Sequence, residues 1–195
     1  MRLEPSPLAA LVVVAALLAA LPAGARSPSP RTPDEQREAL IGLLGATELR
    51  LGRALLDTVG DDVPHQLILV ADLPAVAPTV RTRAVAALAY YPSPQTRGYL
   101  VSLLHERSLA NTAVGALLRR QAIRSLGAGF GEGAIDDLIP LQGDRDPLIR
   151  EAVARGLGDT ASAHALPTLE AWLGREPELT VRAAIDHAIS QLRGR

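Results

Sequence analysis

Four stretches of the chain share one register, in which an aliphatic residue is followed by arginine and, eight positions later, by a second aliphatic residue. The residue at position +4 is alanine, valine or isoleucine, and the residue at position +7 is small. The four starts are Val80, Leu118, Ile149 and Val181, which lie 38, 31 and 32 residues apart. A self-similar period of this length is typical of stacked helical repeats.

The spacing within each unit is that of one buried helix face, because side chains at positions 0, +4 and +8 lie on the same side of an α-helix. Twelve positions after the +8 residue, a second apolar stripe begins, with residues spaced three apart. Its pairs are Leu100 with Leu103, Leu138 with Leu141, and Leu169 with Trp172. This stripe belongs to the first helix of a pair, and the arginine belongs to the second helix.

We predict an all-α domain of about five antiparallel helix pairs, since short connections make consecutive helices antiparallel neighbours. Thr32 before Pro33 and Asp146 before Pro147 are expected helix caps. The glycine-rich segment 127–133 is expected to be a flexible turn, and the small +7 residues are expected where helices cross. The expected pairs are 34–44 with 47–59, 63–72 with 79–90, 96–107 with 113–127, 133–142 with 147–158, and 164–174 with 179–193.

Composition restricts the function classes. The formal net charge is −1, which provides no overall attraction to nucleic acid or to an anionic membrane. Hydrophobic residues make up 48% but aromatic residues only 3%, which favours closely packed helices over a β-sandwich. The absence of cysteine excludes disulfides, thiolate metal sites and a cysteine nucleophile.

The N-terminus indicates export. Residues 1–25 have the form of a secretory signal peptide, with an apolar run over 8–21 that ends at Pro22. This run is shorter than the ~20 residues that span a bilayer. We expect cleavage after Ala25 and no stable membrane span afterwards; the alternative is an uncleaved anchor. Residues 26–33 form a Pro/Ser-rich flexible spacer, and 34–195 form the helical domain. The expected location is periplasmic or extracellular.

One stretch resembles a known repeat family. Residues 149–159 (IREAVARGLGD), followed by Ala165-Leu166-Pro167-Thr168-Leu169, are similar to a HEAT repeat of the bacterial type also found in phycobilisome lyases. The resemblance is strong over 78–195 and weaker over 33–77. It implies a right-handed α-solenoid, an armadillo-like superhelix whose second helices line the concave side. It also implies an interaction scaffold; lyase activity is not carried over.

No catalytic, metal-binding or cofactor-binding residues are assigned. The four histidines (His65, His105, His164 and His187) show no zinc-site spacing. The acid pairs Asp61-Asp62 and Asp136-Asp137 suit the first turn of a helix, where negative charge is favoured. Segment 127–133 lacks the strand and the Lys-Ser/Thr pair of a phosphate loop.

Two sets of polar residues remain as candidates. The +1 arginines (Arg81, Arg119, Arg150 and Arg182) are interpreted as structural residues of the repeat seam that bond loop carbonyls or a neighbouring acid such as Asp144 or Asp146; the alternative is a basic ladder for a partner. The +2 and +6 positions lie opposite the buried stripe. Arg120, Arg124, Glu151, Arg155 and His187 occupy this face and are the predicted partner-binding residues. They could receive an acidic peptide, and the alternative is a solvated face.

The sequence therefore predicts an exported, non-enzymatic protein–protein interaction scaffold. Its partner, a protein or peptide, would bind the face formed by the second helices. One alternative is an accessory subunit of an envelope enzyme. Another is a structural protein that associates with itself, because the last helix pair has no separate polar capping helix after it.

Overall fold

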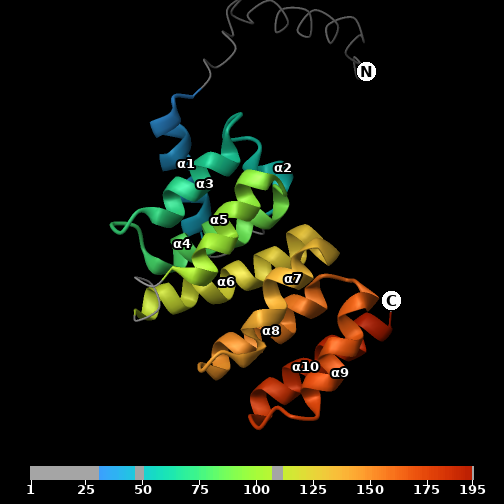
Figure 1. Cartoon of the computed structure of the whole chain (residues 1–195). Coiled ribbons are helices and arrows are strands. Elements are labelled where there is room, and N and C mark those ends of the chain that lie inside the picture. Colours follow the sequence, from blue (N-terminus) through green and yellow to red (C-terminus); the bar gives the residue numbers. More distant parts are fainter. Residues whose placement is uncertain (1–30, 47–50, 107–111, 195) are drawn as a thin grey trace, which may run out of the picture. The chain divides into compact units, whose positions relative to one another are not determined.

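The predicted helix pairs occur in the predicted order (Figure 1). The computed structural model describes residues 31–46, 51–106 and 112–194, and these belong to one compact unit, 31–195. The predicted signal peptide (1–25) and most of the spacer (26–33) lie outside the described residues. Within the described ranges the secondary structure consists of α-helices and short 3-10 turns, without a strand.

The helices fall into first and second members of successive pairs. The first members are α1 (Pro33–Gly45), α3 (Val63–Asp72), α5 (Pro94–His105), α7 (Ile135–Leu138) and α9 (Leu166–Leu173). The second members are α2 (Arg53–Leu56), α4 (Pro78–Ala87), α6 (Ala113–Phe130), α8 (Pro147–Asp159) and α10 (Leu179–Arg193). The 3-10 turns are η2 (Leu88–Tyr90), η3 (Gly131–Ala134), η4 (Ile139–Gly143) and η5 (Ala163–Ala165).

The second helices α4, α6, α8 and α10 form a continuous layer. α4 packs against α6, α6 against α8, and α8 against α10, while α3, α5 and α9 each pack against the second helix of their own pair. In Figure 1, α6, α8 and α10 follow one another from the middle of the domain to its C-terminal end. This arrangement confirms the predicted all-helical, solenoid-like stack.

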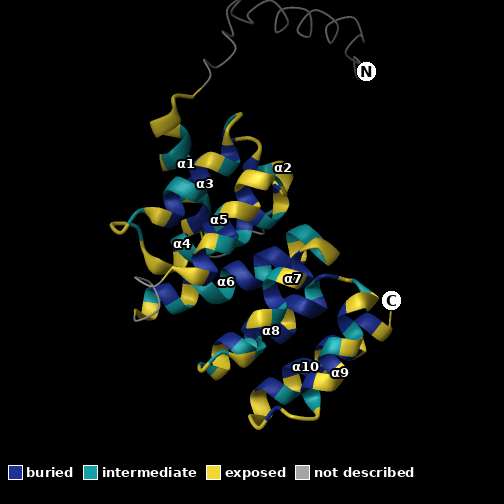
Figure 2. Ribbon diagram, in the orientation of Figure 1, coloured by how far each residue is buried: buried dark blue, intermediate teal, exposed yellow. Residues whose placement is uncertain are grey.

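The core follows the sequence register. The aliphatic side chains at positions 0, +4 and +8 of all four units are buried; at +8 these are Leu88, Leu126, Leu157 and Ile189. The predicted stripe of the first helices is buried as well, including Trp172. Figure 2 shows buried residues on the helix sides that face other helices and exposed residues on the outer sides. Burial of this apolar surface is the main stabilising contribution to the stack.

The predicted caps are present. The Thr32 side chain accepts a hydrogen bond from the Glu35 main-chain N–H, and the Glu35 carboxylate accepts one from the Thr32 N–H. Together they form a capping box in front of Pro33. Asp146 accepts from the Leu148 N–H at the start of α8. Both caps satisfy N–H groups that have no partner within their own helix.

Three expected segments differ in the structure. The turn predicted over 127–133 does not start at Gly127, because α6 continues to Phe130 and Gly127 is buried at a helix crossing. The chain leaves α6 at Gly131, whose φ of +54° favours glycine. The expected helix 133–142 is divided into η3, α7 and η4. The expected helix 47–59 appears only as α2, with 47–50 outside the described residues.

A search of the described helices finds none that is both long and apolar enough to cross a membrane.

Candidate protein-interaction surface

The layer of second helices is close-packed because small residues lie where the helices cross. A Cβ atom added to Gly127 of α6 would overlap the main chain of Gly156 in α8. A Cβ atom on Gly158 would lie 3.0 Å from the Cβ of Ala188 in α10. In both contacts, position +9 of one second helix meets position +7 of the next. The small +7 residue thus lets neighbouring backbones approach closely.

All four +1 arginines donate hydrogen bonds to main-chain carbonyl groups near the end of the first helix in their own pair. The donor–acceptor pairs are Arg81 Nε to Ala71 O (2.7 Å), Arg119 Nε to Leu104 O (2.9 Å), Arg150 Nη1 to Asp144 O (2.9 Å) and Arg182 Nη1 to Leu173 O (3.0 Å). The last carbonyl groups of a helix have no N–H group to pair with inside that helix. Each arginine supplies a donor to one of these carbonyl groups.

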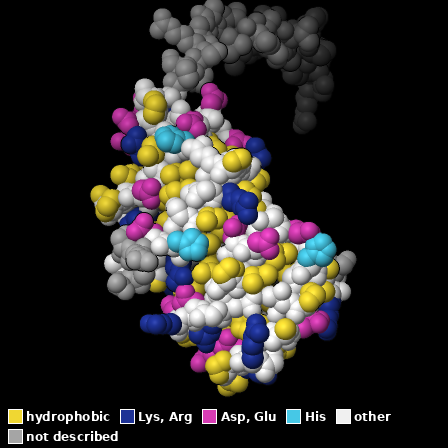
Figure 3. Space-filling model, viewed as in Figure 1, with side chains coloured by type: hydrophobic (Ala, Val, Ile, Leu, Met, Phe, Trp, Pro, Cys, Tyr) yellow, Lys and Arg dark blue, Asp and Glu magenta, His cyan; other side chains and the backbone are white. Residues whose placement is uncertain are grey.

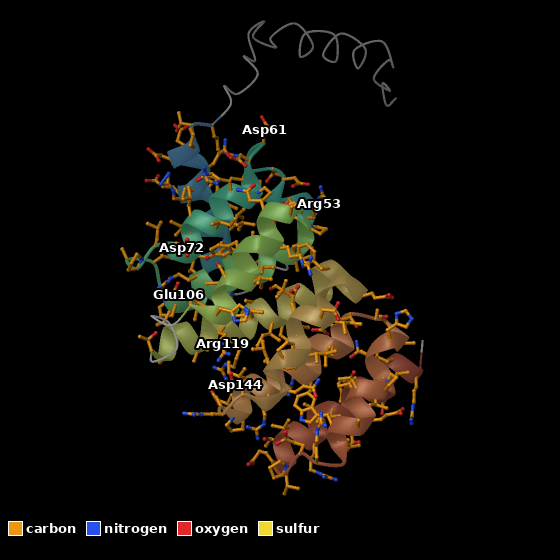
Figure 4. All side chains as sticks on the ribbon, viewed as in Figure 1. Arg53, Asp61, Asp72, Glu106, Arg119 and Asp144 are labelled. Atoms are coloured by element: carbon orange, nitrogen blue, oxygen red, sulfur yellow. The ribbon has the colours of Figure 1, made fainter. Side chains whose placement is uncertain are left out.

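Two of these arginines also contact an acid of the next pair. Arg119 Nη2 lies 2.7 Å from a carboxylate oxygen of Asp144, and Figure 4 shows the two side chains together at the edge of the stack. Arg150 binds both carboxylate oxygens of Glu176, at 3.0 and 2.7 Å. Asp144 and Glu176 each lie six residues before the arginine of their own pair. Consecutive pairs are therefore linked by the same kind of contact.

Glu176 is the most deeply embedded member of this network. Its side chain is buried and also accepts hydrogen bonds from Trp172 Nε1 at 2.9 Å and from the Glu178 N–H at 3.1 Å. The hydrogen bond from Arg150 is the main cause that lowers the pKa of Glu176 below its ordinary value of 4.5; burial opposes this effect. A hollow of about 440 Å³ beside Arg150 and Trp172 is lined by these paired groups. With its carboxylate already bonded on both oxygens, Glu176 is suited to holding the fold.

The polar face of α6 forms the floor of a longer depression. Leu117, Arg120, Gln121, Arg124 and Ala128 all lie on this face, at intervals of three, one, three and four residues. Such spacing keeps side chains on one side of a helix. We call this surface, together with the residues of α4 and α8 that border it, the α6 trough.

The trough consists of two adjoining depressions that share Gln121 and Arg124. One, of about 250 Å³, lies between α6 and α8, and its α8 side is made by Leu148, Glu151, Ala152 and Arg155. The other, of about 300 Å³, borders α4 and η2, whose residues there are Ala86, Ala89 and Tyr90. Three successive second helices therefore contribute to one surface.

The charges in the trough are largely paired. Arg124 forms an ion pair with Asp159, and Arg155 Nη2 lies 2.5 Å from Glu151 Oε1. Arg120 donates from Nε to the carbonyl of Ala116 in its own helix at 3.3 Å, and it has no ion pair within the described part of the chain. Figure 3 likewise shows basic, acidic and hydrophobic side chains interspersed on the face in view. The trough is thus weakly basic, with Arg120 as its available cation.

The structure brings four of the five predicted partner-binding residues together: Arg120, Arg124, Glu151 and Arg155 all line the trough. His187 is exposed on α10 and does not line it. Sequence reasoning missed Leu117 and Leu148, which line the trough while 38% and 47% exposed. Both immediately precede the aliphatic start of a repeat, and this shared position was the signal that could have identified them.

The other polar groups in the described part of the chain form no comparable site. All four histidines are exposed. His164 Nδ1 lies 2.7 Å from Glu132, whose other oxygen accepts from the Ser162 hydroxyl at 3.0 Å. Here the carboxylate, and not the imidazole, contacts the serine, so the arrangement lacks the base that would activate a serine nucleophile. A search of the described ranges finds no group of three or more acidic, histidine or cysteine side chains suited to a metal ion.

These features define a class: an α-helical repeat protein whose second helices form one close-packed layer with an open trough. A family model described as HEAT repeats matches residues 115–190, from within α6 to within α10. These residues are HEAT repeats, which confirms the resemblance seen in the sequence. HEAT repeats generally serve as protein-interaction scaffolds and are typically non-enzymatic. A comparison with curated proteins finds no match.

Proposed function

We propose that the protein is an exported, non-enzymatic scaffold that binds a partner protein or peptide in the α6 trough. The observation that carries this proposal is the trough itself, an open surface lined by side chains of α4, α6 and α8, of which those on α6 and α8 include exposed ones. Such a surface suits an elongated partner, and HEAT repeats generally act through surfaces that bind proteins. The +1 arginines are taken to be structural, since their donors are used by carbonyl groups and acids of the stack.

Site-specific photo-crosslinking tests the binding face. A benzoylphenylalanine residue at Ala128, exposed within the trough, should capture the partner in native extracts. The matched control replaces Ser102, exposed on α5 outside the trough residues. Capture from position 128 alone supports the proposal, whereas equal or exclusive capture from position 102 contradicts the assignment of the face. The identity of the captured protein also tells whether the scaffold serves an envelope enzyme.

Export is supported by the apolar run over 8–21 and the small residues before Arg26. N-terminal sequencing of the protein isolated from its native cells tests it directly. We expect a chain that begins at Arg26. A chain that begins at Met1 would show that the segment is retained.

A further inference from the structure

The α6–α8 part of the trough combines exposed aliphatic surface with an available cation. Leu117 and Leu148 belong to neighbouring second helices and line the same depression. Core leucines in these helices are almost completely buried, for example Leu126 and Leu157 at 0%. The exposed fractions of Leu117 and Leu148, 38% and 47%, show that much of their side-chain surface is not used for packing. This surface is free to contact an apolar side chain of another molecule.

The charges in the trough limit which charged groups a bound molecule can carry. The trough contains Arg120, Arg124 and Arg155, but Asp159 and Glu151 neutralise the last two. One positive charge, on Arg120, is left in excess. A single carboxylate matches this excess and can form two parallel hydrogen bonds with a guanidinium group. A polyanion fits less well, because Glu151 and Asp159 would repel its additional charges.

The length of the trough limits how much of a bound molecule it can contact. Leu117 and Ala128 are eleven positions apart on α6, which corresponds to about 16 Å along the helix at 1.5 Å per residue. An extended chain covers that distance with about five residues at 3.3 Å each. The trough therefore holds a short segment of a partner and not a large domain surface.

We infer that the trough recognises a short peptide segment in which one Asp or Glu is flanked by aliphatic side chains. The carboxylate binds Arg120, and the aliphatic side chains contact Leu117 and Leu148. This inference depends on the proposed function, since it specifies the ligand chemistry of the same surface. It differs from a purely acidic ligand because two of the three arginines already have carboxylate partners.

Peptide selection tests the ligand chemistry. Displayed random peptides of about twelve residues are selected on the purified protein, a length that covers the trough with room at both ends. Enriched peptides should share Asp or Glu beside Leu, Ile or Val. Enrichment of basic peptides, of peptides with no acidic residue, or of none would overturn the inference.

Variants then locate the contact. Binding of an enriched synthetic peptide is measured by fluorescence anisotropy, and Arg120→Glu and Leu148→Asp should each raise Kd by about tenfold or more. The matched controls are Arg145→Glu and Leu179→Asp, which alter exposed residues that do not line the trough. They should change Kd less than about twofold. Thermal melting by circular dichroism confirms that each variant is folded.

The remaining outcomes separate this inference from the proposed function. Crosslinking from Ala128 combined with undiminished binding in Arg120→Glu would keep the binding face and reject the ligand chemistry. Crosslinking only from Ser102 would reject both. Binding to phosphatidylglycerol vesicles that depends on Arg120, without any peptide binding, would replace the peptide with an anionic surface and so overturn the inference.

Discussion

At the residue scale, the +1 position uses a property that only arginine has. A guanidinium group carries five N–H donors in a planar arrangement and accepts no hydrogen bond. Arg150 gives one donor to the Asp144 carbonyl and two to the Glu176 carboxylate. One side chain thereby binds the first helix of its own pair and the loop of the next pair. The ammonium group of lysine lacks this planar geometry, so lysine is a poor substitute.

The buried carboxylate of Glu176 makes stability depend on pH. Its pKa is lowered in the folded protein, mainly by the hydrogen bond from Arg150, so the stabilising contribution is present above the unfolded value of 4.5. It is lost as pH falls through the lower folded value, because the folded state must then take up a proton. We expect Glu176→Gln to reduce the free energy of unfolding by about 3 kcal/mol near neutral pH. Urea unfolding measures this loss.

The same experiment at low pH supplies the decisive comparison. Between about pH 7 and about pH 3, the gap between wild type and Glu176→Gln should narrow, since only the wild type loses a charge at this position. The control is Glu170→Gln, which removes an exposed ion pair with Arg193 and should cost about 1 kcal/mol or less. A gap that stays constant with pH would contradict the role assigned to the Glu176 carboxylate.

Leu157 tests the repeat register itself. It occupies position +8 of the unit that starts at Ile149 and is 0% exposed. Leu157→Ala should lower the free energy of unfolding by about 2–5 kcal/mol, because it removes buried methyl groups and leaves a cavity. Leu179→Ala makes the same chemical change at a side chain that is 77% exposed and should be close to neutral. Denaturant titration compares them, and equal effects would reject the register.

At the element scale, stability depends on how closely α6 and α8 approach. A Cβ on Gly127 would overlap the Gly156 main chain, so Gly127→Ala must push the helices apart. We expect Gly127→Ala to lower the free energy of unfolding by about 1–3 kcal/mol. Gly98→Ala on α5 is the matched control, because a Cβ there meets no atom within 4 Å. It should stabilise the protein by about 0.5–1 kcal/mol, because alanine loses less conformational freedom than glycine when it is fixed in a helix. Thermal melting shows whether the two substitutions shift Tm in opposite directions.

The fold was largely predictable because its main signal repeats. The aliphatic positions 0, +4 and +8 identify α4, α6, α8 and α10 with their buried faces, and each is buried in the structure. Gly127 was misjudged because glycine is both a turn residue and the residue that permits close helix contact. Only the position of α8 decides between these roles. Segment 133–142 was predicted as one helix, but Gly133 and Pro140 weaken its helical continuity.

The candidate surface was predictable only in part. The +2 and +6 positions are set by helical period, so Arg120 and Arg124 could be placed on the outer face of their helix. The pairing of Arg124 with Asp159 joins residues 35 apart and depends on how α6 and α8 pack. The exposure of Leu148 has the same origin, because the period of one helix does not reveal what its neighbour covers. His187 was included by period alone, and the trough residues do not extend to it.

At the scale of the whole domain, α10 differs from the other second helices. In α6 and α8 the residues at +5 and +9 are buried, and they are Ile123 with Gly127 and Ala154 with Gly158. These positions face the following second helix. The equivalent residues of α10 are Asp186 and Ser190, and both are exposed. The corresponding face of α10 is therefore polar, as expected for a surface that contacts water.

This polar face bears on whether copies of the domain stack end to end through α10. Burying Asp186 without a partner would cost free energy, so we expect the purified protein to be monomeric in light scattering at all accessible concentrations. Replacing both residues, Asp186→Leu with Ser190→Leu, should create an apolar face and produce concentration-dependent association. The pair Glu170→Leu with Ala171→Leu adds two exposed leucines on α9 and controls for nonspecific hydrophobic association. If the wild type dimerises and Asp186→Arg leaves the dimer intact, the self-contact lies elsewhere. If Asp186→Arg disrupts the dimer, α10 itself is the interface.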